Sequence, residues 1–376
     1  MTTRFGFVST YPPTRCGLAS FTASLRDALI RPGTDTGVVV RLVDAPAPRP
    51  APEVVAQVVR GDHEALQKAV AHLNACDVVV VQHEYDVYGG RDGEDILLLL
   101  DGLSVPSIVV LHTVLSTPTP HQREVLEAVV AKADGVVAMT QTAHDLLASG
   151  YDVDLGKIRL IPHGARDMTA PVHSTMFRTG QFTALTWGLL SPGKGVEWAI
   201  DAMALLGNQP RAPRYIIAGP TQPAVLATDG EAYRDGLLAQ VSRLGLQSSV
   251  TFDGQFRDPA SLAQLVRSAD VVVLPYDSTE QVTSSVLVEA VAAGKPVIAT
   301  EFPHARDLLA RGAGLLVPHR DPEAVAAALR TLITRGDLAA SMAIAAAAEA
   351  PQLRWPAVAE QYRALASLLI VATVAA

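Results

Sequence analysis

The stretch from residue 271 to 300 constrains the fold of this chain more than any other part of the sequence. It reads as a short apolar strand at 271–274, a polar loop, a helix over about 283–293 and a second strand at 297–300. Gly294 follows the helix, where a residue that tolerates the left-handed conformation is typical. The first strand is rich in β-branched residues, as in strands buried on both faces of a parallel sheet. The stretch therefore predicts a β–α–β unit.

The beginning of the helix in this stretch carries three small hydroxyl residues, Thr283, Ser284 and Ser285. Such residues cap a helix and leave backbone N–H groups available at its N-terminus. A helix that begins at the carboxyl end of a parallel strand can bind an anion there. We therefore expect an anion-binding site at this point.

The same alternation of strands and helices extends over the whole chain. We expect strands in the first half at 4–9, 38–43, 77–82, 107–111, 135–139 and 157–161. We expect strands in the second half at 182–187, 215–218, 250–252, 271–274, 297–300 and 314–317. Such alternation predicts parallel sheets with right-handed crossovers. The segment 163–181 lacks periodicity and should connect two α/β domains.

Length and composition agree with two domains. A chain of 376 residues exceeds what one hydrophobic core usually supports. The net charge of −8 argues against a general nucleic-acid surface. Two cysteines, Cys16 and Cys76, indicate a reducing compartment and no disulfide framework. No signal peptide is apparent at the start, and the apolar run 364–376 is too short to span a bilayer, so we expect a cytoplasmic protein.

Several familiar site types are absent from the sequence. The segment from Gly188 to Gly195 nearly forms a phosphate-binding P-loop, but Gly195 stands where a magnesium-binding hydroxyl is required. There is no G-x-G-x-x-G, no metal-ligand motif and no G-x-S-x-G elbow. Glu84, Asp86 and Glu289 could form a hydrolase pair of carboxylates, but the sequence does not set their separation.

The stretch 271–300 resembles the donor-site motif of the retaining glycosyltransferases of family 4, which have the GT-B fold. In that motif two glutamates lie eight residues apart, and Glu289 matches the second. Gln281 occupies the first position, and Glu280 is one residue out of register. The resemblance covers most of residues 4–370 and is strongest over 182–320.

Two other segments resemble the same family. Gly188 to Gly195 is similar to the turn Gly-Arg-Leu-x-x-x-Lys-Gly, in which Lys194 matches the lysine and Leu189 replaces the arginine. His112 matches a histidine that contacts the donor sugar, whereas His83 at the preceding strand end remains open to a structural interpretation. The loop of Arg15 and Gly17 is similar to a loop of the family that approaches the donor phosphates. His163 is similar to a residue at the hinge between the family's two domains.

The resemblance implies two Rossmann-like α/β domains that face a central cleft, with a C-terminal helix returning to the first domain. It implies an N-terminal acceptor-side domain at 1–165, a linker at 166–181, a donor domain at 182–350 and the returning helix at 351–376. The implied catalytic residues are His112, Gln281 and Lys194. The implied donor-binding residues are Arg15, Gly17, Gly188, Lys194, Gly219, Gln255, Thr283, Ser284, Ser285 and Glu289.

The resemblance also implies the reaction. Glu289 should bind the ribose hydroxyls, while Lys194 and the amides of 283–285 hold the diphosphate. A sugar is then transferred from a nucleotide-diphosphate donor to a carbohydrate or small-molecule acceptor, with retention and without a metal or other cofactor. A phosphorylase on the same fold and a non-catalytic nucleotide-sugar binder remain alternatives, since Leu189 and Gln281 depart from the pattern. The nucleotide, the sugar, the acceptor, the oligomeric state and any peripheral membrane contact stay open.

Overall fold

The computed structural model describes residues 2–48, 51–168, 180–207 and 213–375. The chain divides into two compact units. Unit 1 comprises Met1–Gly164 together with Trp355–Ala376, and unit 2 comprises Ala165–Arg354. Most of the segment expected as a linker, 166–181, lies outside the described residues.

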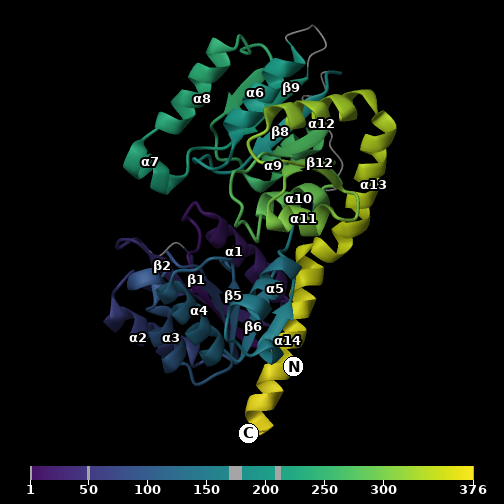
Figure 1. The fold of residues 1–376 in the computed structure, drawn as a ribbon. Coiled ribbons are helices and arrows are strands. Elements are labelled where there is room, and N and C mark those ends of the chain that lie inside the picture. The colour runs from purple at the N-terminus through teal and green to yellow at the C-terminus, as the bar shows by residue number, and fades with distance from the viewer. Residues whose placement is uncertain (1, 49–50, 169–179, 208–212, 376) are drawn as a thin grey trace. The chain divides into compact units, whose positions relative to one another are not determined.

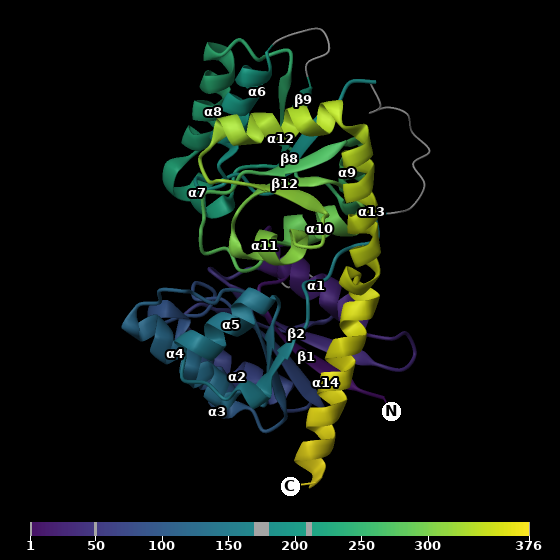
Figure 2. The same ribbon diagram turned by 45° about the vertical axis from the view of Figure 1, so that its right-hand side comes forward.

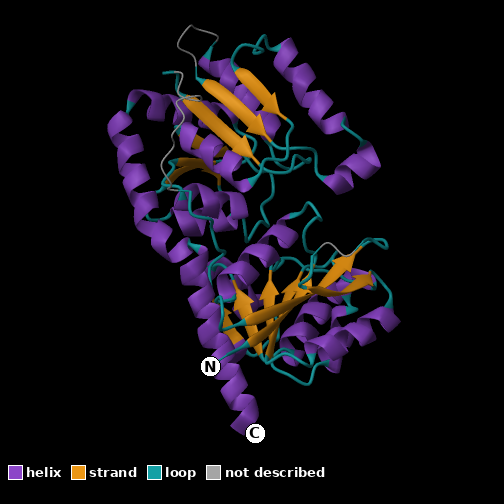
Figure 3. Ribbon diagram, turned by 180° about the vertical axis from the view of Figure 1, so that it is seen from behind, coloured by secondary structure: helices purple, strands orange, loops and turns teal. Residues whose placement is uncertain are grey.

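Unit 1 is built on a seven-stranded parallel sheet with the strand order β3-β2-β1-β4-β5-β6-β7 (Figure 3). Its strands are β1 (Arg4–Ser9), β2 (Thr36–Val43), β3 (Val54–Val59), β4 (Val78–His83), β5 (Ser107–Leu111), β6 (Gly135–Ala138) and β7 (Ile158–Leu160). The chain reverses its direction along the sheet after β3, between β1 and β4. In open α/β sheets, ligands bind beside the carboxyl ends of the strands at such a switch point.

Helices cover both faces of this sheet. They are α1 (Gly17–Leu29), α2 (His63–Leu73), α3 (Ile96–Gly102), α4 (Pro120–Lys132), α5 (Gln141–Gly150) and α14 (Trp355–Ala375), with the short turns η1 (Arg91–Gly93) and η2 (Leu155–Lys157). One core cluster joins the sheet to α1 and α14, which lie side by side (Figure 1). In it, Phe7 and Val80 of the sheet pack with Leu25 of α1 and Tyr362 of α14.

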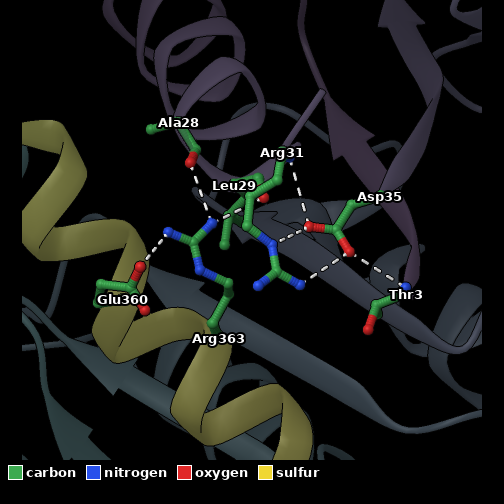
Figure 4. Close-up of polar contacts among 7 residues, drawn as sticks. All are labelled: Thr3, Ala28, Leu29, Arg31, Asp35, Glu360 and Arg363. Carbon is green, nitrogen blue, oxygen red and sulfur yellow. Dashed lines mark hydrogen bonds and ion pairs between the residues drawn. The ribbon is translucent and has the colours of Figure 1, made fainter. Parts of the chain in front are cut away.

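Helix α14 is also held by polar contacts (Figure 4). The Arg363 guanidinium donates to the carbonyl oxygens of Ala28 and Leu29, 3.1 and 2.8 Å away, and to Glu360 at 2.6 Å. Because Ala28 and Leu29 end α1, their carbonyls have no partner within that helix. A residue near the C-terminus thus caps the first helix of the chain.

Unit 2 is built on a six-stranded parallel sheet with the order β10-β9-β8-β11-β12-β13. Its strands are β8 (Thr183–Trp187), β9 (Arg214–Ala218), β10 (Val250–Asp253), β11 (Val271–Leu274), β12 (Val297–Thr300) and β13 (Gly314–Val317). Its helices are α6 (Val196–Leu206), α7 (Pro223–Asp229), α8 (Ala232–Arg243), α9 (Pro259–Ser268), α10 (Ser285–Ala292), α11 (Pro303–Leu309), α12 (Pro322–Thr334) and α13 (Gly336–Leu353).

The helices of unit 2 form two layers around its sheet (Figure 2). One core cluster packs α9, α10, α11 and α13 against one face, and another packs α6, α8 and α12 against the other. Alternate residues of the central strand serve the two clusters, since Val272 belongs to the first and Val273 to the second. This two-sided burial explains why β11 consists entirely of apolar residues.

The expected strands are present, but the sequence interpretation missed three elements. Strand β3 was not expected, nor were the short helices α7 and α11. Helix α13 ends at Leu353, with Pro351 in its last turn. Among the described residues no helix is long and apolar enough to cross a membrane.

Candidate functional site

In unit 2 the loops that follow β8 and β11 contact each other and are joined by hydrogen bonds at the carboxyl edge of the sheet. The Asp277 N–H donates to the Gly193 carbonyl at 2.9 Å, and the Trp198 indole Nε1 donates to Asp277 Oδ1 at 2.9 Å. Gly195 lies so close to Pro275 that a Cβ at position 195 would come within 1.8 Å of the Pro275 carbonyl oxygen. The two segments singled out from the sequence, 188–195 and 271–300, therefore meet.

The loop after β9 joins the same edge through a contact between two glycines. A Cβ on Gly219 would lie 1.9 Å from the Gly188 carbonyl oxygen, and Gly219 has a φ of +132° that favours glycine. Gly188 in turn faces α10, because a Cβ there would lie 3.6 Å from Val286 Cγ2. The expected positions Gly188 and Gly219 thus bring backbone close to the start of α10.

Helix α10 begins at Ser285, with Ser284 as its N-cap. The Ser284 Oγ accepts a hydrogen bond from the Leu287 N–H at 3.3 Å. The Ser284 N–H donates to His304 Nδ1 at 2.8 Å, so this amide, expected to bind diphosphate, already has a partner. Among the described residues the N–H groups of Ser285 and Val286 have no acceptor. These two amides are the ones that could bind an anion.

Glu289 lies one turn after Ser285, and residues four apart share one face of a helix. Burial raises the pKa of its carboxyl above the usual range, while the positive charge of Arg166 and the nearby Trp187 indole partly offset this effect. The Trp187 Nε1 is buried and completes no hydrogen bond among the described residues. Arg166 and Trp187 were not identified from the sequence, because only the fold brings them to Glu289.

Lys194 follows the Gly193 turn at the same edge. Its Nζ lies over the Tyr276 ring, 4.4 Å from the ring centroid, and Tyr276 follows β11. Within the part of the chain that the structure describes, the Lys194 ammonium forms no ion pair. The aromatic face favours a cation without neutralising it, so the charge is available to an anion.

Gln281 is folded back onto its own loop. Its Nε2 donates to the Thr283 carbonyl oxygen at 2.8 Å, and a carbonyl oxygen can only accept, so the amide nitrogen must face it. The Oε1 atom therefore remains as an acceptor. Thr283 itself has a buried Oγ1 without a hydrogen-bond partner among the described residues.

Gln255 lies farther along the edge, after the outermost strand β10. Its side chain is exposed and its backbone N–H donates to Asp253 Oδ1 at 3.1 Å. Two cations that the sequence interpretation missed lie nearby: Arg257 pairs with Asp253, and Arg234 donates to the Gly219 carbonyl. Arg234 comes from the first turn of α8, where nothing in the local pattern distinguishes it from a surface residue.

In unit 1 the loop after β1 leads into α1 with Cys16 as the N-cap. The Cys16 Sγ accepts from the Ala19 N–H at 3.4 Å. Gly17 is exposed, and a Cβ at this position would have no atom within 4 Å. Arg15 is exposed as well. The helix start therefore has open space before it, as ligand approach would require.

His112 follows β5 and is held in one orientation. Its Nε2 lies 2.7 Å from Gln82 Oε1, and its ring meets the Phe21 ring edge to face at 4.7 Å. Burial, together with His163 and His83, lowers the pKa of His112 to about 3. At neutral pH the ring is therefore neutral, with the proton on Nε2 facing Gln82 and Nδ1 left as an acceptor.

The neighbouring strand end carries two titratable groups, His83 and Glu84, whose pKa values are shifted by burial. Both ring nitrogens of His83 are buried without a partner among the described residues, and burial lowers its pKa to about 4. Burial also raises the pKa of Glu84, whose Oε2 accepts from Thr113 Oγ1 at 2.7 Å. His163 Nδ1 lies 2.7 Å from the Gly164 carbonyl oxygen, at the end of the first segment of unit 1.

Among the described residues, no three His, Cys, Asp or Glu side chains are placed to hold a metal ion. The residues expected from the sequence thus fall into two sets. Gly188, Lys194, Gly219, Gln281, Ser285 and Glu289 meet at the carboxyl edge of unit 2, while Arg15, Gly17 and His112 belong to unit 1.

Solved structures share this architecture. HepE from Anabaena, solved in complex with UDP and glucose, has a TM-score of 0.75 at 19% identity, covering 98% of this chain and 100% of that one. Sucrose-phosphate synthase from Thermosynechococcus elongatus has a TM-score of 0.78 at 21% identity, with the same coverage. The two parallel-sheet units are the Rossmann-like domains of GT-B glycosyltransferases.

Curated relatives share about three residues in ten. A D-inositol 3-phosphate glycosyltransferase of Rhodococcus opacus is 28% identical over 366 residues, covering 87% of this chain and 80% of the relative. One of Segniliparus rotundus is 29% identical over 289 residues, where this chain spans 61% of the relative. The family model described as Glycosyltransferase Family 4 matches residues 16–166, and that of Glycosyl transferases group 1 matches residues 181–335. The chain therefore belongs to the group 1, family 4 glycosyltransferases.

Proposed function

We propose that this glycosyltransferase takes its sugar from a nucleotide-diphosphate donor and transfers it with retention of configuration and without a metal ion. One observation carries the proposal: the Lys194 ammonium, which forms no ion pair among the described residues, shares one sheet edge with the two open amides of α10 and with the Glu289 carboxyl one turn later. This combination matches the diphosphate and the ribose of a nucleotide.

The chemistry assigns each group a role. Lys194 and the amides of Ser285 and Val286 bind the diphosphate, whose negative charge increases as the bond to the sugar breaks. Donors that are already in place stabilise this charge more than they stabilise the bound donor, which lowers the barrier. Glu289 accepts from the ribose hydroxyls.

The roles of the sugar-binding residues follow from the acceptors they present. Gln281 offers Oε1 and His112 offers Nδ1, and either can accept a hydrogen bond from a sugar hydroxyl. Neither carries a charge at neutral pH. We therefore assign them to orienting the donor sugar, with Arg15 and Gly17 assigned to the donor phosphates.

The acceptor is suggested by relatives, several of which are named D-inositol 3-phosphate glycosyltransferases. We propose a phosphorylated polyol as the acceptor class, with inositol 3-phosphate as the first compound to test. A phosphorylase remains the second candidate, since the site that binds a diphosphate would also accept inorganic phosphate.

The test is a binding and turnover panel on the full chain. Calorimetry with UDP, GDP, ADP and inorganic phosphate should show at least one nucleotide binding far more tightly than phosphate. Turnover with the matching sugar nucleotide and inositol 3-phosphate should persist in EDTA, and NMR of the product should show the anomeric configuration of the donor. Binding of phosphate alone would favour the phosphorylase, and binding without turnover would favour a non-catalytic binder.

A further inference from the structure

We propose that His304 is a positioning residue that holds the loop 281–284 in the geometry required for donor binding. The sequence offered no reason to select it, because it lies in the unexpected helix α11 and outside every motif. Its effect on ligands rests on the proposed function, whereas its hold on the loop can be tested without any ligand.

His304 lies in a closely packed part of unit 2. It lies in the first turn of α11, directly after β12, and only 4% of its surface is exposed. Phe302, the N-cap of α11, is fully buried and stacks on Tyr276 with the ring centroids 5.2 Å apart. Tyr276 in turn belongs to the loop after β11. The helix that carries His304 is thus packed against the base of the loop that carries Gln281.

His304 binds this loop at both ends. Its ring Nδ1 accepts from the Ser284 N–H at 2.8 Å, and its own backbone N–H donates to the Gln281 carbonyl oxygen at 3.3 Å. Residues 281 and 284 are therefore both bound to one residue, which lies twenty positions after Ser284 in the sequence. These bonds fix the loop between the sugar-orienting Gln281 and the start of α10.

The ring bond defines one chemical form of the histidine. Nδ1 can accept from an N–H only when it carries no proton, so the bonded ring is the neutral tautomer with its proton on Nε2. Asparagine can place its Oδ1 close to the position of Nδ1 and accept the same bond. Leucine fills a similar volume but offers no acceptor.

The bond also decides which amides of α10 face a ligand. A helix begins with four N–H groups that have no partner inside it. His304 binds that of Ser284, and the Ser284 hydroxyl binds that of Leu287. The two remaining amides, of Ser285 and Val286, point the same way along the helix axis. Without His304 the buried Ser284 N–H loses its acceptor, which costs free energy until the loop moves.

Hydrogen exchange tests the contact on the ligand-free full chain. Variants His304→Leu and His304→Asn are compared with Leu309→Ala, a buried change at the other end of the same helix. We expect exchange in the segment 282–288 to become about tenfold faster in His304→Leu, as the loss of one such bond allows. In His304→Asn the exchange rate of this segment should stay near that of the parent. Equal acceleration in His304→Leu and Leu309→Ala, or none in His304→Leu, would overturn the proposal.

Binding tests the consequence for the site. We expect His304→Leu to bind the nucleoside diphosphate about tenfold more weakly, while the nucleoside alone binds as in the parent. We expect His304→Asn to bind the nucleoside diphosphate as tightly as the parent does. Equal loss for nucleoside and diphosphate would show that His304 is merely structural. If the parent binds no nucleotide at all, the proposed function fails, and the exchange experiment still decides whether His304 holds the loop.

Discussion

The carboxamide of Gln281 illustrates how a single residue's contacts limit its chemistry. Its NH₂ group is committed to the Thr283 carbonyl, so it presents an acceptor oxygen as a glutamate would, but without the charge. A glutamate at this position would place a carboxylate oxygen against a carbonyl oxygen, and two acceptors repel each other. The departure from the family motif is therefore built into the loop.

We expect Gln281→Ala to lower kcat/KM about tenfold or more, because a sugar hydroxyl loses its acceptor. Gln281→Glu should also lower it, because the loop loses its bond to Thr283. Steady-state rates for these variants and for Glu280→Gln decide the matter. If Glu280→Gln is the damaging change and Gln281→Ala is silent, Glu280 supplies the group that we assign to Gln281.

We expect Lys194→Ala to weaken binding of the nucleoside diphosphate by about 1.5–3 kcal/mol, the usual contribution of a charge-assisted hydrogen bond. The free nucleoside should be unaffected. Lys157→Ala is the matched control, since the Lys157 ammonium is bound to helix carbonyls in unit 1. Calorimetry that shows the same loss for nucleoside and diphosphate would remove Lys194 from the anion site.

Glu289 should make the folded protein less stable at neutral pH. Its folded pKa is raised above 4.5, so its favourable contribution is complete below about pH 4.5 and is lost as the pH rises through the folded value. We expect Glu289→Gln to raise the free energy of unfolding at pH 8, with a smaller gain at pH 5, and to weaken ribonucleotide binding. Urea unfolding at both pH values measures the first effect, and a variant less stable at pH 8 would contradict it.

At the scale of single elements, one arginine joins the C-terminal helix α14 to α1 by hydrogen bonds. Arg363 caps the end of α1 and so joins the first and last helices of the chain (Figure 4). We expect Arg363→Leu to lower the free energy of unfolding by about 1–3 kcal/mol, because two carbonyls lose a charged donor. Arg335→Leu, which removes an exposed ion pair with Asp337, should leave the free energy of unfolding nearly unchanged. Equal effects in chemical unfolding would show that Arg363 has no special role.

The sequence predicted the elements whose patterns are long or strongly apolar. The central strands stand out as β-branched runs, whereas β3 follows an Ala- and Pro-rich segment and is only partly buried. Helix α11 has seven residues, which is too short for a helical period to show. The same limit explains the site: Lys194 and Glu289 lie in recognisable motifs, but His304, Arg166 and Arg234 contribute through contacts that only folding creates.

At the scale of the whole molecule, unit 1 consists of two separated pieces of chain. Trp355, Val358 and Tyr362 of α14 are buried in the same core cluster as strands β1, β4 and β5. We expect residues 1–164 alone to bind hydrophobic dyes and to unfold at low denaturant, because that core face is uncovered. A peptide of residues 355–376 should restore a cooperative transition in circular dichroism. A cooperative transition without the peptide would contradict this dependence.

The place where the chain leaves unit 1 and returns to it is a single point. The Ala165 N–H donates to the Leu353 carbonyl at 2.6 Å, and a Cβ on Gly164 would lie 2.2 Å from the Trp355 ring. Unit 2 is therefore topologically an insertion with adjacent ends. In evolutionary terms, crossovers at these two adjacent junctions could exchange unit 2 for the corresponding half of a relative without altering the chain path of unit 1.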